Sequence, residues 1–171
     1  MSKAQRIGKS MAIGAVSGLA ASWAMNQYWT VESNLKKQIK SSRQRNRDQQ
    51  QDSFDSATVQ TAERISREVS GHELPRDQKE KAGSAVHYAF GAAMGALYGL
   101  LSEVAPASRG GFGLGYASLL WLVADEIAVP AFGLSKRPDE YPLSKHLEGL
   151  GAHLVYGATT EGMRRMLRWA A

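Results

Sequence analysis

The sequence contains no cysteine, which excludes disulfide bonds, thiolate metal sites, iron–sulfur clusters and a cysteine nucleophile. It also contains no motif that identifies a reaction, so we expect a protein that is not an enzyme. Its 171 residues are enough for one domain. The formal net charge of +5 and the pI of about 9.6 are compatible with an anionic partner.

Charged residues are missing from two long stretches. The 22 residues between Lys9 and Glu32 and the 21 between Lys81 and Glu103 contain no Asp, Glu, Lys or Arg. Because a helix that spans a bilayer needs about 20 mostly apolar residues, both stretches are long enough to cross one. Residues 112–132 and 147–167 are weaker candidates, since each contains charged residues. The sequence therefore predicts an all-α integral membrane four-helix bundle.

Two alternatives to this prediction remain. A soluble four-helix bundle would carry charged residues on the outer face of each helix, but residues 10–31 and 82–102 carry none on any face. A cleaved signal peptide would use Lys3, Arg6 and Lys9 as its basic region. The apolar stretch is long for a signal peptide and no clean cleavage site follows it, so we expect a retained spanning helix.

The charge divides the chain into three parts. Residues 1–30 hold the N-terminal segment and the first spanning helix, and residues 82–171 hold the other three. The 31–81 linker between them contains 11 of the 21 Lys/Arg and 9 of the 16 Asp/Glu. Within it, residues 55–70 are expected to form an amphipathic helix that ends at Gly71, with the next helix starting at Pro75. The apolar face of that helix comprises Val59, Ala62, Ile65 and Val69.

The basic residues of the linker suggest a partner. Because no aromatic residues are interleaved with them, nucleic-acid binding is not expected. Lys/Arg clusters beside a membrane bind anionic lipid headgroups. We therefore expect that role for Lys36, Lys37, Arg43 and Arg45. Counting Lys and Arg on the two sides of the bundle gives 14 on the linker side and 7 on the other, which favours cytoplasmic loops.

Small residues recur every fourth position in three of the predicted helices. Such rows let helix backbones approach closely within lipid. They do not distinguish packing within the chain from packing in a homo-oligomer or a larger membrane complex. The rows comprise Gly14 and Gly18 (followed by Ser22 and Asn26), Gly91, Gly95 and Gly99, and Gly149 and Gly157.

Polar residues fall at one depth if the four helices alternate in direction. At about 1.5 Å per residue they lie roughly 6–12 Å below the linker side of the bundle. This intramembrane polar layer could exchange protons or bind a small ion, or it could only join helices by hydrogen bonds, as in an accessory subunit. The candidate residues are Asn26, His87, Asp125, Glu126 and His153, with Glu103, Glu161 and Arg164 near the opposite surface.

Two details qualify this layer. Asp125 and Glu126 point about 100° apart on a helix, so at most one can face the layer comfortably. His87 and His153 could instead ligate a b-type haem in an electron-transfer subunit. We expect no cofactor, however, and no metal site, since the spacing of the His and carboxylate residues does not match a metal motif.

The C-terminal half resembles a known family in three segments. They are Ser102-Glu103-Val104-Ala105-Pro106, Val129-Pro130-Ala131-Phe132-Gly133-Leu134, and Leu147-Glu148-Gly149 followed by Ala152-His153-Leu154-Val155-Tyr156. Residues 82–168 are similar to the YagU-like family of small bacterial inner-membrane proteins. The resemblance implies a multi-pass protein of the bacterial inner membrane, without an established activity. It implies that the positions matching the family pattern are His87, Glu103, His153, Glu161 and Arg164.

Overall fold

The computed structural model describes residues 1–39 and 56–170, and every regular element in these residues is helical. The predicted all-α class is therefore confirmed. The α-helices are α1 (Lys3–Ile39), α3 (Ala57–Ser70), α4 (Arg76–Val104), α5 (Leu114–Trp121), α6 (Val129–Ala131) and α7 (Leu143–Ala170). A 3₁₀ segment (Pro106–Gly113) precedes α5, a π-helical segment (Leu122–Ala128) joins α5 to α6, and a short 3₁₀ turn (Pro138–Glu140) precedes α7.

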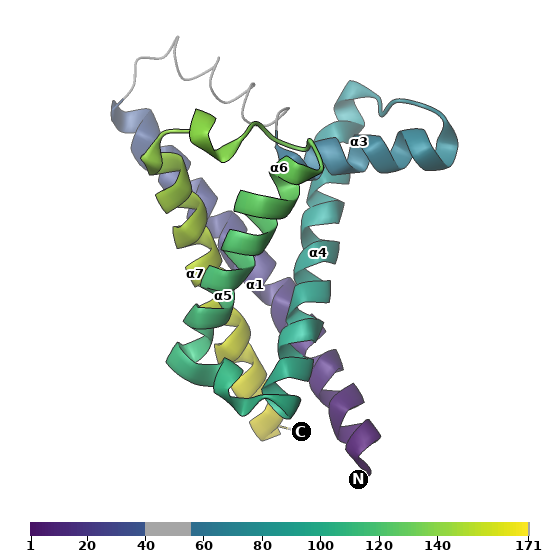
Figure 1. Cartoon of the computed structure of the whole chain (residues 1–171), viewed down its shortest axis with the longest axis vertical. Helices are drawn as coiled ribbons and strands as arrows, with labels where there is room; N and C mark the ends of the chain where they lie inside the picture. The colour runs from purple at the N-terminus through teal and green to yellow at the C-terminus, as the bar shows by residue number, and fades with distance from the viewer. Residues whose placement is uncertain (40–55, 171) are drawn as a thin grey trace.

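The long helices alternate in direction. Figure 1 shows both chain termini at one end of the bundle, with α3 and the segment between α6 and α7 at the other. Helix α1 packs against both α4 and α7, and α5 packs against α7. The 37, 29 and 28 residues of α1, α4 and α7 correspond to lengths of about 42–56 Å at 1.5 Å per residue. Each of these helices is therefore longer than the ~30 Å hydrocarbon core of a bilayer.

By length and hydropathy, one helical stretch of the described residues could cross a membrane. It is Pro106–Ala131, with a mean hydropathy of 1.4 over its most apolar window. The four spanning helices expected above are thus not shown by this criterion. Helices α1, α4 and α7 are rich in Ala, Gly and Ser and also carry charged residues, both of which lower their mean hydropathy.

Glycines bring α1 and α4 into direct backbone contact. A Cβ atom added to Gly18 would lie 3.0 Å from the Cα of Gly95 and would overlap the carbonyl oxygen of Gly91. A Cβ added to Gly14 would lie 3.0 Å from the Cα of Gly99. The two glycine rows therefore face each other within one chain. The backbones can approach this closely because glycine has only a hydrogen atom as its side chain.

The row on α7 has a different partner. A Cβ added to Gly157 would lie 2.5 Å from the Cβ of Ala117 and 2.6 Å from the carbonyl oxygen of Gly113. A Cβ added to Gly149 would lie 3.2 Å from the Trp121 indole nitrogen. The row therefore packs α7 against α5 and the segment that leads into it.

The third predicted helix differs from the expectation of one helix over residues 112–132. Gly111, Phe112 and Gly113 have φ angles of 62°, 56° and 81°, so regular α-helix begins only at Leu114. The chain then widens into the π segment, where the Val129 N–H bonds to the Ala124 carbonyl, five residues earlier. Pro130 follows directly and has no N–H to continue an α-helical ladder, which favours the wider turn at this point.

The amphipathic helix of the linker is α3. Ser56 caps it by accepting a hydrogen bond from the Val59 N–H at 3.4 Å, and Gly71 ends it with φ = 72°. Val59 and Ala62 are buried, but Ile65 and Val69 are 50% and 82% exposed. Only half of its predicted apolar face is therefore covered. The next helix, α4, begins one residue later than expected, with Pro75 as its N-cap.

Candidate functional site

The π segment places two neighbouring carboxylates against two histidines of α7. Oδ2 of Asp125 lies 3.6 Å from Nδ1 of His153, and Oε1 of Glu126 lies 2.8 Å from Nδ1 of His146. The two carboxylates thus point to different partners. His146 was not predicted as a member of the polar layer. Its spacing of seven residues from His153, two helical turns, places both histidines on one face of α7 and was the available signal.

The predicted layer is brought together only in part. His87 interacts electrostatically with both His153 and Asp125, and its Nε2 lies 3.3 Å from the Ser22 carbonyl oxygen on α1. Asn26 does not join these three, because its side-chain amide donates to the Tyr88 hydroxyl at 3.2 Å. The layer therefore consists of His87, Asp125 and His153, with Glu126 and His146 as a second pair beside it.

The hydrogen bonds define where protons sit. Nδ1 of His153 lies 3.0 Å from the Gly149 carbonyl oxygen. Because a carbonyl can only accept, this nitrogen carries the proton. The His153 side chain is 7% exposed, whereas the Asp125 side chain is 44% exposed. A carboxylate at the surface of the bundle thus lies beside a buried imidazole, and the two groups can exchange a proton.

The layer offers limited means of holding a metal or a haem. Within residues 1–39 and 56–170, no group of three or more His, Asp or Glu could hold a metal ion. Nε2 of His87 and Nδ1 of His153 face carbonyl oxygens. A haem would therefore need Nδ1 of His87 and Nε2 of His153 as its axial ligands. The haem hypothesis stays a prediction.

A second polar site lies at the end of the bundle where the termini meet. The Glu161 carboxylate, which has no exposed surface, accepts hydrogen bonds from the Tyr98 hydroxyl at 2.9 Å and from Nε of Arg165 at 2.6 Å. Arg164 donates to both of its oxygens, at 2.7 and 2.9 Å. Nearby, Arg168 donates to Glu103 at 2.9 Å. The residues predicted for this surface, Glu103, Glu161 and Arg164, therefore all lie in ion pairs.

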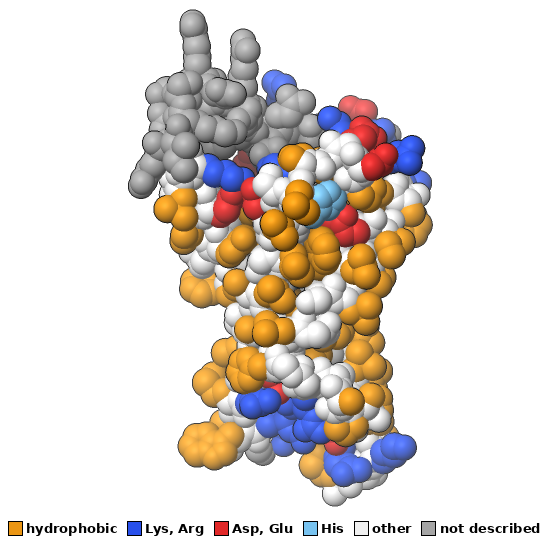
Figure 2. Space-filling view, turned by 60° about the vertical axis from the view of Figure 1, so that its left-hand side comes forward, with side chains coloured by type: hydrophobic (Ala, Val, Ile, Leu, Met, Phe, Trp, Pro, Cys, Tyr) orange, Lys and Arg blue, Asp and Glu red, His pale blue; other side chains and the backbone are white. Residues whose placement is uncertain are grey.

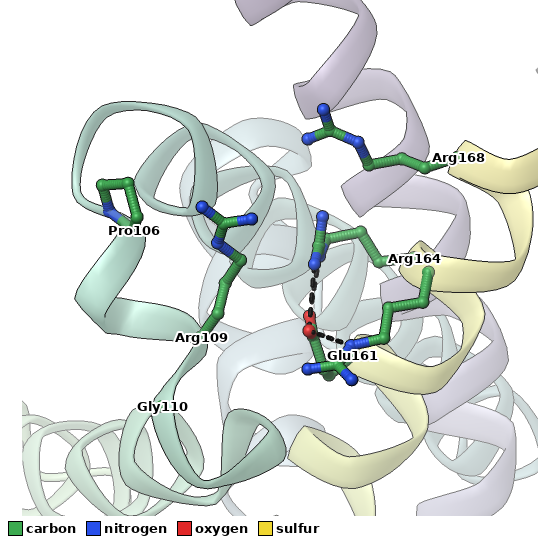
Figure 3. A pocket seen from close by; sticks show the side chains of 7 residues that line it. Pro106, Arg109, Gly110, Glu161, Arg164 and Arg168 are labelled. Atoms are coloured by element: carbon green, nitrogen blue, oxygen red, sulfur yellow. Dashed lines mark hydrogen bonds and ion pairs between the residues drawn. The ribbon is translucent and has the colours of Figure 1, made fainter.

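These ion pairs border a cavity of about 570 Å³, which we call the arginine pocket. Figure 3 shows the Arg109 side chain extending from the 3₁₀ segment toward Arg164 and Arg168 of α7. The Arg165 guanidinium also lies 4.8 Å from the centre of the Phe112 ring, within cation–π range. The pocket is lined by Pro106, Arg109, Gly110, Glu161, Arg164, Arg165 and Arg168.

Sequence analysis did not identify the arginine pocket as a site. Residues 161, 164, 165 and 168 follow i, i+3, i+4, i+7 spacing, which places them on one helix face and could have revealed three of its arginines. Arg109 comes from a different element, 52 residues before Glu161. The alternation of helix directions places Arg109 at the same end of the bundle, but no helical spacing connects it to that face of α7.

The cationic cluster expected to bind lipid headgroups is described only in part. The Lys36 ammonium pairs with Glu32 and lies 2.7 Å from the Glu148 carboxylate. Arg43 and Arg45 lie outside the described residues, as does the Lys37 side chain. Lipid binding by this cluster stays a prediction.

Together these observations define an all-helical protein with its polar groups gathered near the two ends of a bundle. A family model described as "Protein of unknown function (DUF1440)" matches residues 45–162, and the chain belongs to this family. The match includes α3, which lies before the region of YagU-like resemblance; that resemblance itself stays a prediction. No curated protein and no solved structure matches the chain.

Proposed function

We propose that the chain is a multi-spanning membrane protein that handles protons through its histidine–carboxylate pairs, without catalysing a covalent reaction. The observation that carries the proposal is the pairing of Asp125 with His153 at 3.6 Å and of Glu126 with His146 at 2.8 Å. Ionisable groups at membrane depth are costly, so their presence in pairs is typical of proton or ion pathways.

The distribution of apolar side chains supports a position in the bilayer. Figure 2 shows hydrophobic side chains over the middle of the bundle and charged side chains at its two ends. In water, each exposed Å² of apolar surface costs about 25 cal/mol, whereas in lipid this cost disappears. The large apolar residues exposed on the bundle include Val16, Leu19, Trp23, Phe90, Leu97, Leu119, Leu122, Val123 and Ile127.

The order of the groups suggests a route. The His146–Glu126 pair lies close to the loop, since the second ring nitrogen of His146 is 3.1 Å from the Pro138 carbonyl oxygen. Asp125 and His153 follow, and His87 of α4 interacts with both. Histidine titrates near neutral pH, so such a series can take up and release protons under physiological conditions. With the loops cytoplasmic, as the Lys/Arg count favours, protons would enter from the cytoplasm.

Proton flux into proteoliposomes tests this function. The purified full-length chain is reconstituted with a pH-sensitive dye inside the vesicles, and an imposed pH gradient drives the flux. Removing a group that transfers protons typically lowers a rate by about 10²–10⁴-fold. We expect Asp125→Asn and His153→Gln to reduce flux by at least about tenfold on that basis.

A matched control separates proton transfer from surface charge. Asp139 is an exposed loop carboxylate whose side chain lies 3.3 Å from that of Arg137. Asp139→Asn removes the same charge as Asp125→Asn and should leave flux unchanged. A wild-type protein without flux, or equal flux in all variants, would contradict the proposal.

An accessory subunit of a larger membrane complex, or a homo-oligomer, is the second candidate function. The glycine rows of α1 and α4 face each other within the chain, so a partner would need another surface. Leu119, Leu122, Val123 and Ile127, which belong to α5 and the π segment, are exposed and offer such a surface. This candidate predicts co-purification with a partner that is lost in Leu119→Asn, and no proton flux by the chain alone.

A further inference from the structure

The arginine pocket, at the opposite end from the histidines, holds more positive than negative charge. Its lining includes four guanidinium groups, from Arg109, Arg164, Arg165 and Arg168. The carboxylates paired with them are Glu161 and Glu103, so four positive charges against two negative charges leave an excess of two. Like charges gathered in one cavity repel each other, and an anion would relieve that repulsion.

Of the four arginines that line the pocket, Arg109 takes no part in an ion pair with a residue that the structure describes. Among the residues that the structure describes, none forms a hydrogen bond or ion pair with it, although it interacts electrostatically with Glu103. Its side chain is half-buried and extends toward Arg164 and Arg168 (Figure 3). Its five N–H donors are thus not used by any described residue, and its side chain lines the cavity.

The other arginines also keep donors for a ligand. Arg164 uses two N–H groups on Glu161, and Arg168 donates a hydrogen bond to Glu103. Arginines in the last turns of α7 are favoured by the partial negative charge of a helix C-terminus, which accounts for Arg168 without any ligand. That effect does not account for Arg109, which belongs to the 3₁₀ segment before α5.

We propose that the arginine pocket binds a phosphate group. Phosphate oxygens accept paired hydrogen bonds from the planar guanidinium fork, which makes arginine the preferred residue for phosphate recognition. The cavity of about 570 Å³ exceeds the size of a phosphate ion and leaves room for an esterified group. An anionic lipid headgroup and a free phosphate present the same acceptor oxygens, so the ligand is defined here by its phosphate group and the experiment below separates the two sources. Phosphate binding at this end of the bundle does not require proton handling at the other end.

Two binding measurements on the full-length chain in neutral detergent test the proposal and separate the two sources. Isothermal titration calorimetry with inorganic phosphate tests the free anion. Native mass spectrometry with equimolar phosphatidylglycerol and phosphatidylcholine tests the anionic headgroup. The variant is Arg109→Gln, which removes no internal ion pair. The control is Lys3→Gln, which removes an exposed charge from the same end of the chain, outside the pocket lining.

We expect Arg109→Gln to weaken binding at least about tenfold, the usual effect of losing a charged hydrogen bond, with Lys3→Gln unchanged. A loss seen with inorganic phosphate would support the pocket and identify a free phosphate. If Arg109→Gln instead loses only the preference for phosphatidylglycerol over phosphatidylcholine, the result would support the pocket and identify a lipid headgroup as the ligand. No binding in either measurement, or equal effects of both variants, would overturn the proposal. Circular dichroism verifies that both variants keep the helical fold.

Discussion

Glu161 and Arg164 form a two-fold hydrogen-bonded ion pair inside the bundle, with N–O distances of 2.7 and 2.9 Å. Their side chains are 0% and 4% exposed. The Tyr98 hydroxyl of α4 donates to the same carboxylate, so the pair also joins α7 to α4. Such a pair is costly to break, because removing one member leaves the other charged and buried.

Glu161→Gln should therefore destabilise the protein by about 3 kcal/mol or more. The neutral amide keeps the size of the side chain but cannot balance the buried Arg164 guanidinium. Denaturant unfolding followed by circular dichroism measures the loss. The matched variant is Glu103→Gln, whose partner Arg168 is 42% exposed. An equal effect of both variants would show that the Glu161 pair does not stabilise the bundle.

Gly95→Ala should destabilise the contact between α1 and α4 by about 1–3 kcal/mol, the usual cost of overpacking. The added methyl group would lie 2.7 Å from the Cα of Gly18, closer than real carbon atoms approach. Gly8→Ala on α1 is the control, since nothing lies within 4 Å of a Cβ at that position. Both variants gain the same helix propensity, so the difference in Tm isolates the clash. Equal Tm values would mean that the two rows do not touch.

The His146–Glu126 pair should make stability depend on pH. The Glu126 carboxylate accepts a hydrogen bond from His146 and raises the pKa of this histidine above its usual value of 6.5. A raised pKa in the folded state means that the stabilisation is complete below pH 6.5 and is lost as pH rises through the folded pKa. The Tm advantage of wild type over His146→Gln should therefore shrink between pH 5.5 and 8.5. An advantage that stays constant or grows would contradict the pairing.

An absorbance spectrum distinguishes the proton-handling layer from haem binding. We expect no Soret band in the detergent-purified protein, since the sequence predicts no cofactor, although the contacts with backbone carbonyls leave a second nitrogen on the His87 and His153 rings. The comparison variants are His87→Ala and His153→Ala. A Soret band that is present in wild type and lost in both variants would establish that the two histidines bind a haem.

Periodic features of the fold could be predicted from the sequence. The four-residue glycine spacing predicted close contacts between helix backbones, because a helix places such residues on one face whatever surrounds it. That α1 and α4 make this contact within one chain is known from the structure. Gly71 was expected to end α3 and does so with φ = 72°. These features depend on residues that are neighbours along one helix.

Features that depend on irregular backbone or on distant residues could not be predicted. A regular α-helix over residues 112–132 was expected, and the π segment that directs Asp125 and Glu126 to different histidines is an exception to α-helical spacing. Arg109 joins the arginine pocket only because the chain turns at Gly111 and Gly113, whose φ angles are positive. The pairing of Glu126 with His146 depends on this departure from regular α-helical backbone, so helical spacing alone could not predict it.

In the proposed membrane bundle, α1, α4, α5–α6 and α7 lie in a bilayer with the two polar ends on opposite sides. Because the chain has no cysteine, each introduced cysteine is the only thiol in its variant. Val16→Cys and Leu119→Cys place it among the exposed apolar residues, and Lys3→Cys and Lys136→Cys place it at the two ends. A membrane-impermeant maleimide added to proteoliposomes reports which positions meet water.

The thiols at positions 16 and 119 should stay unreactive until detergent is added, since a thiol in lipid is neither ionised nor reached by the reagent. The thiols at positions 3 and 136 should react from opposite sides of the membrane. Reaction at positions 16 and 119 as fast as at position 136 would contradict the membrane bundle, and with it the proposed path for protons.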